Sequence, residues 1–184
     1  DLLKEVEAVS IVVPTVNHLA VAKKVISTNT NLLIEKPFAI NSSECKQIID
    51  LANESKLVLA IGHIERHNPV IKDLKKRIEK KQFGEIITLS SRRLSSFPGR
   101  IVDVGVIFDL AIHDIDIMCH LAQSEVKSVY CTGGKYKHEN CEDHVMIFIE
   151  FNSGLNALCE ANWLTPTKVR QLYVTTDKLH AAAD

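Results

Sequence analysis

The first third of the chain alternates short apolar runs with helix-like stretches, and this alternation restricts the folds available to it. The apolar runs are Val9 to Val13, Leu32 to Ile34 and Leu57 to Ile61. Helix-like stretches separate them, from about His18 to Thr28 and from about Ser43 to Ser55. Strand, helix and strand at these lengths are typical of parallel βαβ units. Because the runs are almost continuously apolar, they favour a parallel sheet that is covered on both faces.

After Pro69 the pattern changes to a series of strands. A helix-like stretch ends near Gly84, strand Ile86 to Ser91 follows, and an apolar helix is predicted from about Val106 to Leu121. Four further strand-like runs are Val126 to Thr132, Val145 to Phe151, Leu155 to Asn162 and Val169 to Thr175. Successive strands without helices between them favour an antiparallel sheet, and the "NSG" between two of them indicates a hairpin.

The two patterns together predict an α/β protein with two parts. Residues 1–64 are expected to form a partial Rossmann-like parallel sheet, and residues 65–184 an α/β domain with a mostly antiparallel open sheet. A dinucleotide-binding domain normally carries G-x-G-x-x-G after its first strand, and none of the seven glycines has that spacing. We therefore interpret residues 1–64 as the C-terminal part of such a domain, with its Gly-rich half upstream of Asp1. A naturally shortened homologue is the alternative.

Composition excludes several classes of protein. The 184 residues include 22 basic and 23 acidic side chains, so the chain lacks the positive field that nucleic-acid binding requires. Its apolar runs are too short to cross a bilayer, and it opens with no secretory signal. The five cysteines have no Cys-x-x-Cys spacing, which is typical of reduced thiols. These features predict a cytoplasmic protein that binds neither nucleic acid nor membrane.

Polar motifs follow all three strands of the first part. They are "VPTVNH" (Val13 to His18), "EKP" (Glu35 to Pro37) and "GHIERHNP" (Gly62 to Pro69). In an open α/β sheet, ligands bind outside the carboxyl ends of the strands. Pro37 restricts the backbone of Lys36 to extended conformations, so the ammonium group is aimed in one direction. A single Lys at a loop start is more commonly solvated, but three polar motifs at neighbouring strand ends favour a binding site.

Asp109 and His113 lie four residues apart in the apolar helix, so they share one face. A carboxylate beside an imidazole is a common way to orient a general base. Asp116 and His120 follow on the same helix, and a metal site built from His113, Asp116 and His120 is the alternative interpretation. Because no other element clearly supplies a further ligand, we predict no metal.

Four motifs occur in order along the chain: "VPTVNH", "EKP", "GHIERHNP" and "DLAIHDID". As an ordered set they resemble the Gfo/Idh/MocA family of NAD(P)-dependent oxidoreductases, from about Val9 to about Thr176. The segment "RRLSSFPGRIVDVGVIFDLAIHDID" is similar to the family branch that acts on nucleotide-linked amino sugars, the UDP-N-acetylglucosamine 3-dehydrogenases in particular. The resemblance implies a dinucleotide-binding domain, then a substrate domain that is incomplete here at its C-terminus and that often builds homo-oligomers. The final "LHAAAD" matches nothing that the resemblance implies.

The resemblance also implies roles for individual residues. The positions it assigns to NAD or NADP binding are Pro14, Thr15, His18, Glu35, Lys36, Arg66 and Asn68. The positions it assigns to catalysis are Lys36, Asp109 and His113. His113 would take the proton of the substrate hydroxyl, Asp109 would orient it, and Lys36 would stabilise the developing alkoxide. The resemblance further implies a cis Lys36–Pro37 peptide bond.

The sequence therefore predicts an oxidoreductase that transfers a hydride between NAD or NADP and a secondary alcohol of a sugar, nucleotide sugar or cyclitol. One alternative is a non-catalytic regulatory homologue that senses dinucleotide or sugar, and another is an oligomerisation module. A sensor needs no proton acceptor such as His113, and an oligomerisation module does not explain the polar strand ends. Without a phosphate-binding turn, we expect the 184-residue chain alone to bind NAD(H) poorly.

Overall fold

The computed structural model describes residues 2–98 and 104–184. The chain divides into two compact units between His63 and Ile64. The elements of the first unit are η1 (Leu2–Lys4), β1 (Ala8–Ile11), η2 (Thr15–Asn17), α1 (His18–Ile26), β2 (Asn31–Ile34), α2 (Ser42–Glu54) and β3 (Leu59–Ile61). The three predicted strands and two predicted helices of this part are confirmed, with ends shifted by a few residues.

The sheet of the first unit is parallel, in the order β1-β2-β3. Both crossovers step in the same direction along the sheet, so right-handed connections place α1 and α2 on the same face. Leu32 and Ile34 of β2 point into the core beneath the helices, whereas Leu33 is 38% exposed on the opposite face. Among the described residues of this unit, helices cover one face of the sheet, and cover of the other face stays a prediction.

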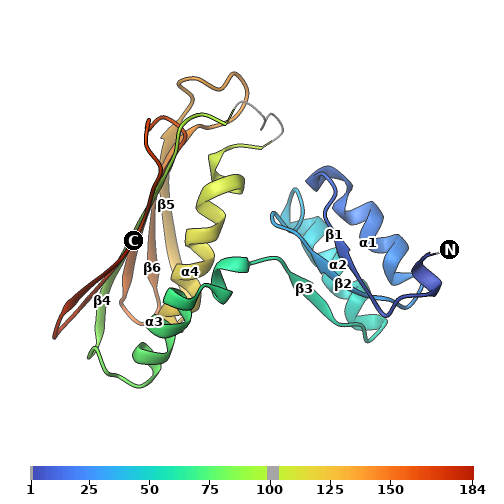
Figure 1. Cartoon of the computed structure of the whole chain (residues 1–184), viewed down its shortest axis with the longest axis horizontal. Helices are drawn as coiled ribbons and strands as arrows, with labels where there is room; N and C mark the ends of the chain where they lie inside the picture. Colours follow the sequence, from blue (N-terminus) through green and yellow to red (C-terminus); the bar gives the residue numbers. More distant parts are fainter. Residues whose placement is uncertain (1, 99–103) are drawn as a thin grey trace. The chain divides into compact units, whose positions relative to one another are not determined.

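The second unit contains a larger sheet and two helices on one of its faces (Figure 1). Its helical elements are η3 (Ile64–His67), α3 (Pro69–Glu79), the π-helical turn η4 (Ile107–Ala111) and α4 (Ile112–Ala122). Its strands are β4 (Ile86–Leu94), β5 (Val126–Gly134), β6 (His144–Phe151), β7 (Asn156–Asn162), β8 (Val169–Thr176) and β9 (His180–Ala183).

The six strands of this sheet run in the order β5-β6-β7-β4-β8-β9. The pair β4–β7 is parallel, and the other four pairs are antiparallel. The prediction of a mostly antiparallel open sheet is therefore confirmed, and so is the hairpin between β6 and β7. Its turn contains Gly154, whose φ of 86° favours glycine.

Alternating side chains of the strands form the core against the helices. Along β6, Val145, Ile147, Ile149 and Phe151 are each at most 4% exposed. Phe148, between two of them, is 44% exposed on the face that α3 and α4 leave open. This period of two gives the sheet one covered and one open face.

The helix predicted from about Val106 to Leu121 is two elements. Residues Ile107–Ala111 form a π-helical turn, and α4 continues from Ile112 to Ala122. The helix ends where Gln123 adopts a left-handed conformation with φ of 52°. A π-turn inserts one residue into the helical repeat, which apolar periodicity does not reveal.

Strand β9 was not predicted. It pairs with β8 in antiparallel register, with Thr175 opposite His180 and Leu172 opposite Ala183. The rings of His180 and Tyr173 stack at 5.5 Å between centroids. The small side chains of "HAAA" show little strand propensity, so this strand forms because β8 offers an edge.

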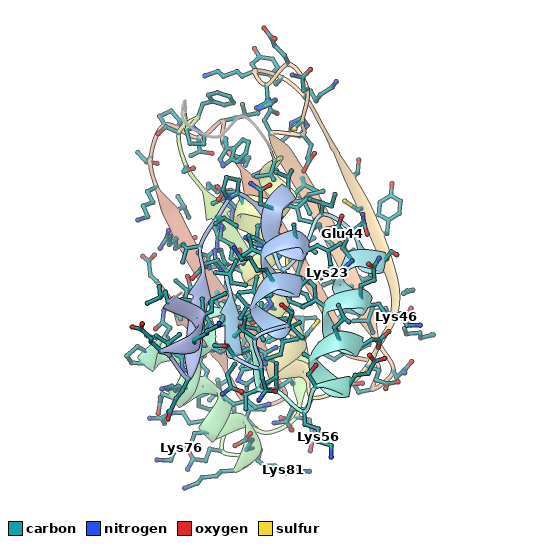
Figure 2. All side chains as sticks on the ribbon, turned by 90° about the vertical axis from the view of Figure 1, so that its right-hand side faces the viewer. Lys23, Glu44, Lys46, Lys56, Lys76 and Lys81 are labelled. Carbon is teal, nitrogen blue, oxygen red and sulfur yellow. The ribbon has the colours of Figure 1, made fainter. Side chains whose placement is uncertain are left out.

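Charged side chains cover the outer faces of the helices. Figure 2 shows Lys23 on α1, Lys46 on α2, Lys76 on α3 and Lys81 in the turn that follows α3, all of them exposed. In residues 2–98 and 104–184, no helix has the length and apolar character needed to cross a membrane.

Candidate functional site

The turn after β2 carries the "EKP" motif. The Lys36–Pro37 peptide bond is cis, which confirms the prediction. The Glu35 carboxylate accepts a hydrogen bond from the backbone N–H of Lys36 at 3.2 Å. It also lies close to Gly62 after β3, because a Cβ on Gly62 would stand 2.9 Å from a Glu35 carboxylate oxygen. Glu35 is therefore held between the ends of β2 and β3.

His18 lies beneath these strand ends rather than on the surface, with 1% exposure. Its Nε2 is 2.9 Å from the carbonyl oxygen of Val13, and its Nδ1 is 3.2 Å from that of Phe38. A neutral imidazole has one N–H, so it donates to one of these carbonyls at a time. The ring joins the segment after β1 to the segment after the cis proline, which supports a positioning role for His18.

Apolar side chains are exposed at the end of β1. Val12 is 71% exposed and Val16 is 62% exposed, and Pro14 lies exposed between them. Thr15, in contrast, is buried in η2. Exposed apolar side chains at the carboxyl end of a parallel strand are suited to packing against a bound ligand.

In the second unit, two positions predicted to bind cofactor hold η3 in place. Arg66 donates from Nε and Nη2 to the carboxylate of Asp116, at 2.9 and 2.6 Å, and this pairing raises the pKa of Arg66. Asn68 is the N-cap of α3, because its Oδ1 accepts from the N–H of Val70 at 3.0 Å. Its Nδ2 donates to Glu65 at 3.2 Å. Contact of Arg66 or Asn68 with a cofactor stays a prediction.

The predicted catalytic residues of the second unit lie at the start of its long helical segment. Asp109 is in the π-turn and His113 is in the first turn of α4, and both are partly buried. Glu142 anchors the π-turn by accepting from the N–H of Ile107 at 3.2 Å. The positive charge that His113 can carry helps to lower the pKa of Glu65, after the larger effects of burial, which raises it, and of Asn68 and Arg93. His113 and Glu65 therefore lie near enough to interact electrostatically.

The second unit also contains a buried charge network that the sequence did not predict. Arg93, 6% exposed, donates from Nε and Nη2 to Asp114 at 2.9 and 3.1 Å, and from Nη1 to Glu65 at 3.1 Å. Burial raises the pKa of Asp114, although Arg93 opposes that shift. Asp114 could have been found from the sequence, because a carboxylate among the apolar residues of α4 requires a partner.

A pocket of about 150 Å³ opens beside Asp109. Its walls include Arg93, Ser95, Asp109, Trp163, Lys168 and Arg170, all from the second unit. Among the residues that the structure describes, no group of three or more His, Cys, Asp or Glu side chains is arranged to hold a metal ion. The wall of this pocket combines the apolar residues Leu94, Pro98 and Leu110 with cationic side chains and one carboxylate.

Comparison with protein families decides what kind of chain this is. Residues 71–180 match the model of the GFO/IDH/MocA C-terminal domain. Residues 1–63 match the model described as "Oxidoreductase family, NAD-binding Rossmann fold". The chain belongs to the Gfo/Idh/MocA family. The resemblance inferred from the four motifs is confirmed.

Individual relatives of the Gfo/Idh/MocA family are similar over most of the chain. UDP-N-acetylglucosamine 3-dehydrogenase of Acidithiobacillus ferrooxidans is 36% identical over 183 residues, which cover 100% of this chain and 57% of that protein. scyllo-Inositol 2-dehydrogenase (NAD⁺) of Bacillus subtilis is 28% identical over 170 residues, which cover 88% of this chain and 50% of that protein. The chain spans about half the length of the curated relatives that it matches.

Solved structures show the same fold. A structure of the Acidithiobacillus ferrooxidans UDP-N-acetylglucosamine 3-dehydrogenase superposes with a TM-score of 0.90 and covers 100% of this chain and 57% of its own. GenD2 from gentamicin A biosynthesis, in complex with NAD, also has a TM-score of 0.90 at 20% identity, covering 97% of this chain and 54% of its own. At 20% identity, the similarity to GenD2 concerns the fold alone. The predicted α/β fold class is confirmed.

Proposed function

We propose that this chain is part of an NAD(P)-dependent dehydrogenase that oxidises a secondary alcohol of a nucleotide-linked amino sugar. The observation that carries the proposal is the pair Asp109 and His113, partly buried at the junction of η4 and α4, with Asp109 in the wall of a pocket. Membership of an oxidoreductase family supports it. The whole reaction removes a hydride and a proton from the alcohol and yields a ketone.

The proposed roles follow from the chemistry of each side chain. His113 takes the hydroxyl proton as general base, and Asp109 orients the imidazole and the substrate. Lys36 donates a hydrogen bond to the same oxygen and stabilises the negative charge that develops on it. NAD or NADP supplies the hydride acceptor when bound. Pro14, the exposed valines beside it and the Glu35 turn form the surface of the first unit against which the cofactor packs.

The choice of substrate rests on the relatives. The relative with 36% identity is named for UDP-N-acetylglucosamine, and this supports a nucleotide-linked amino sugar. The relatives named for inositols are 26–28% identical, and they make a cyclitol the second candidate. A non-catalytic sensor remains the alternative class, which the kinetic test below separates from an enzyme.

The open face of the larger sheet suggests how the protein assembles. Met146 and Phe148 of β6 and Leu158 of β7 are 48%, 44% and 39% exposed on this face. Apolar side chains grouped on one sheet face are typical of a subunit interface. We include homo-oligomerisation through this face in the proposal. A cytoplasmic location is included as well, because all five cysteines are free thiols.

The test is steady-state kinetics of the full-length protein that carries this sequence, with UDP-N-acetylglucosamine and NAD⁺ or NADP⁺. His113→Ala should lower kcat by roughly 10²–10⁴-fold, because a general base contributes about that much. His120→Ala on the same helix is the matched control and should leave kcat within about threefold. Equal losses in the two variants, or full turnover in His113→Ala, would assign proton transfer to another group. An inactive wild-type protein that binds cofactor would favour the sensor.

A further inference from the structure

Two arginines face each other on the helix-covered side of the larger sheet. The antiparallel pairing of β4 and β8 places Arg93 directly opposite Arg170. Both share the face of their buried neighbours, since Ser91 and Leu172 are the next facing pair along the same strands and are 2% and 7% exposed. Like charges directly opposite each other in a sheet are unfavourable unless anions lie close to them.

Among the described residues, carboxylates accept hydrogen bonds from only one of these two arginines, although Arg170 lies near enough to Asp114 to help lower its pKa. All three guanidinium nitrogens of Arg93 donate to Asp114 or Glu65. Arg170 and the nearby Lys168 are exposed, and within residues 2–98 and 104–184 their charged groups form no hydrogen bond or ion pair. The positive charge of Arg170 and Lys168 therefore remains available to a ligand.

The pocket beside Asp109 has a second feature that points to a ligand. Trp163 lines the pocket and is 1% exposed, and its indole N–H has no acceptor among the described residues. A buried donor without an acceptor costs about 1–3 kcal/mol, so such a group usually has a role. Trp163 shares the wall of this pocket with Lys168 and Arg170, which supply its positive charge.

A phosphate is the ligand group that matches this wall. Arginine binds phosphate oxygens in a bidentate manner, and lysine adds a compact positive charge. A pocket of about 150 Å³ accommodates a phosphate and neighbouring sugar atoms rather than a whole nucleotide sugar. Asp109 lines the same pocket and, as a carboxylate, accepts hydrogen bonds from sugar hydroxyls.

We propose that Lys168 and Arg170 bind the phosphate group of the substrate while Asp109 contacts the sugar, so that the chain selects phosphate-bearing sugars over neutral polyols. This proposal rests on the proposed function and deepens it, because it names the charge of the substrate. The phosphate can belong to a nucleotide diphosphate or to a sugar phosphate. Lys168 and Arg170 are specificity residues in this scheme and take no part in proton transfer.

The test uses the full-length protein with Lys168→Met and Arg170→Met, which remove the charge and keep an apolar stem. The KM for UDP-N-acetylglucosamine should rise by about 10- to 100-fold in each variant, because hydrogen bonds to charged groups are worth about 1.5–3 kcal/mol. The kcat should change by less than about threefold, since binding is lost and the reacting groups are untouched. Lys178→Met, an exposed lysine between β8 and β9, is the control for the loss of one charge and should leave KM unchanged.

Calorimetry separates this site from the redox function. UDP-N-acetylglucosamine, N-acetylglucosamine 1-phosphate and neutral N-acetylglucosamine are compared as probes. Weaker binding of both phosphate-bearing probes to the two variants supports the site even if the protein oxidises none of them. A loss confined to the UDP-linked probe assigns the site to a nucleotide diphosphate. Unchanged binding of both anionic probes, or equal losses for the neutral sugar or for Lys178→Met, overturns the proposal and leaves the redox function standing on its own test.

Discussion

The carboxylate of Glu142 lies directly against Gly105, at the start of the π-turn that carries Asp109. A Cβ on Gly105 would overlap this carboxylate. Glu142 in turn accepts from the N–H of Ile107 at 3.2 Å, and its backbone carbonyl accepts from Val106 at 2.9 Å. The absence of a side chain at position 105 therefore allows Glu142 to hold the segment in which Asp109 lies.

Gly105→Ala should displace Glu142 and shift the π-turn. We expect kcat of the full-length protein to fall by about 10- to 100-fold, because catalysis is sensitive to displacements of about 1 Å. Gly154→Ala is the matched control, since a Cβ there meets no atom within 4 Å but its φ of 86° disfavours alanine. That control should lower the free energy of unfolding by about 1 kcal/mol and leave kcat unchanged. Equal kcat values for Gly105→Ala and wild type would show that Glu142 does not position Asp109.

Removal of Arg93 should destabilise the second unit strongly. Arg93→Met leaves the buried carboxylate of Asp114 without its partner, so we expect the free energy of unfolding to fall by about 3–5 kcal/mol. The double variant Arg93→Met with Asp114→Leu should recover much of this loss, because it also removes the buried charge. Urea denaturation monitored by circular dichroism measures both. If the free energy of unfolding of Arg93→Met stayed within about 1 kcal/mol of the wild-type value, the ion pair would be effectively solvated.

Asp143 should make stability depend on acid pH. It is fully buried, and burial alone would raise its pKa, but hydrogen bonds from His144 and from the backbone N–H groups of residues 136–138 hold the pKa well below its usual 3.8. Because the folded pKa is depressed, this stabilisation is present above the unfolded-state value and is lost as pH falls below it. Asp143→Asn should therefore lower the free energy of unfolding by about 2–3 kcal/mol at neutral pH.

The difference in the free energy of unfolding between wild type and Asp143→Asn should become smaller as the pH falls from about 5 towards 3. Denaturation midpoints at a series of pH values measure it. Asp50→Asn, at an exposed position of α2, serves as the control, and its denaturation midpoint should stay close to that of wild type at every pH. A gap between wild type and Asp143→Asn that stays constant down to low pH would contradict the role given to this carboxylate.

A charge on the open sheet face should weaken the proposed oligomer. Phe148→Asp places a carboxylate among apolar side chains that an interface would bury, and burying a lone charge is costly. We expect a smaller mass in solution by light scattering, with circular dichroism unchanged. Lys46→Asp, at an exposed position of α2 in the first unit, should not reduce the mass. An unchanged mass for Phe148→Asp would place the interface on another surface.

Local pattern was sufficient for much of this protein. The alternation of apolar runs with helix-like stretches predicted the βαβ units, and the "NSG" between two apolar runs predicted the hairpin of β6 and β7. The ordered set "VPTVNH", "EKP", "GHIERHNP" and "DLAIHDID" predicted the family, and that resemblance implied the cis bond at Lys36. These features depend on residues that are close in sequence, so the sequence alone determines them.

Other features arise from partners that are distant in the chain. Strand β4 lies between β7 and β8, and this long-range order makes the sheet mixed and brings Arg93 opposite Arg170. The partners of Arg93 come from η3 and α4, 28 and 21 residues away. The π-turn depends on Glu142, 35 residues beyond Ile107. Short-range periodicity carries no information about such contacts, because they are selected by packing among elements and not by the conformational preferences of neighbouring residues.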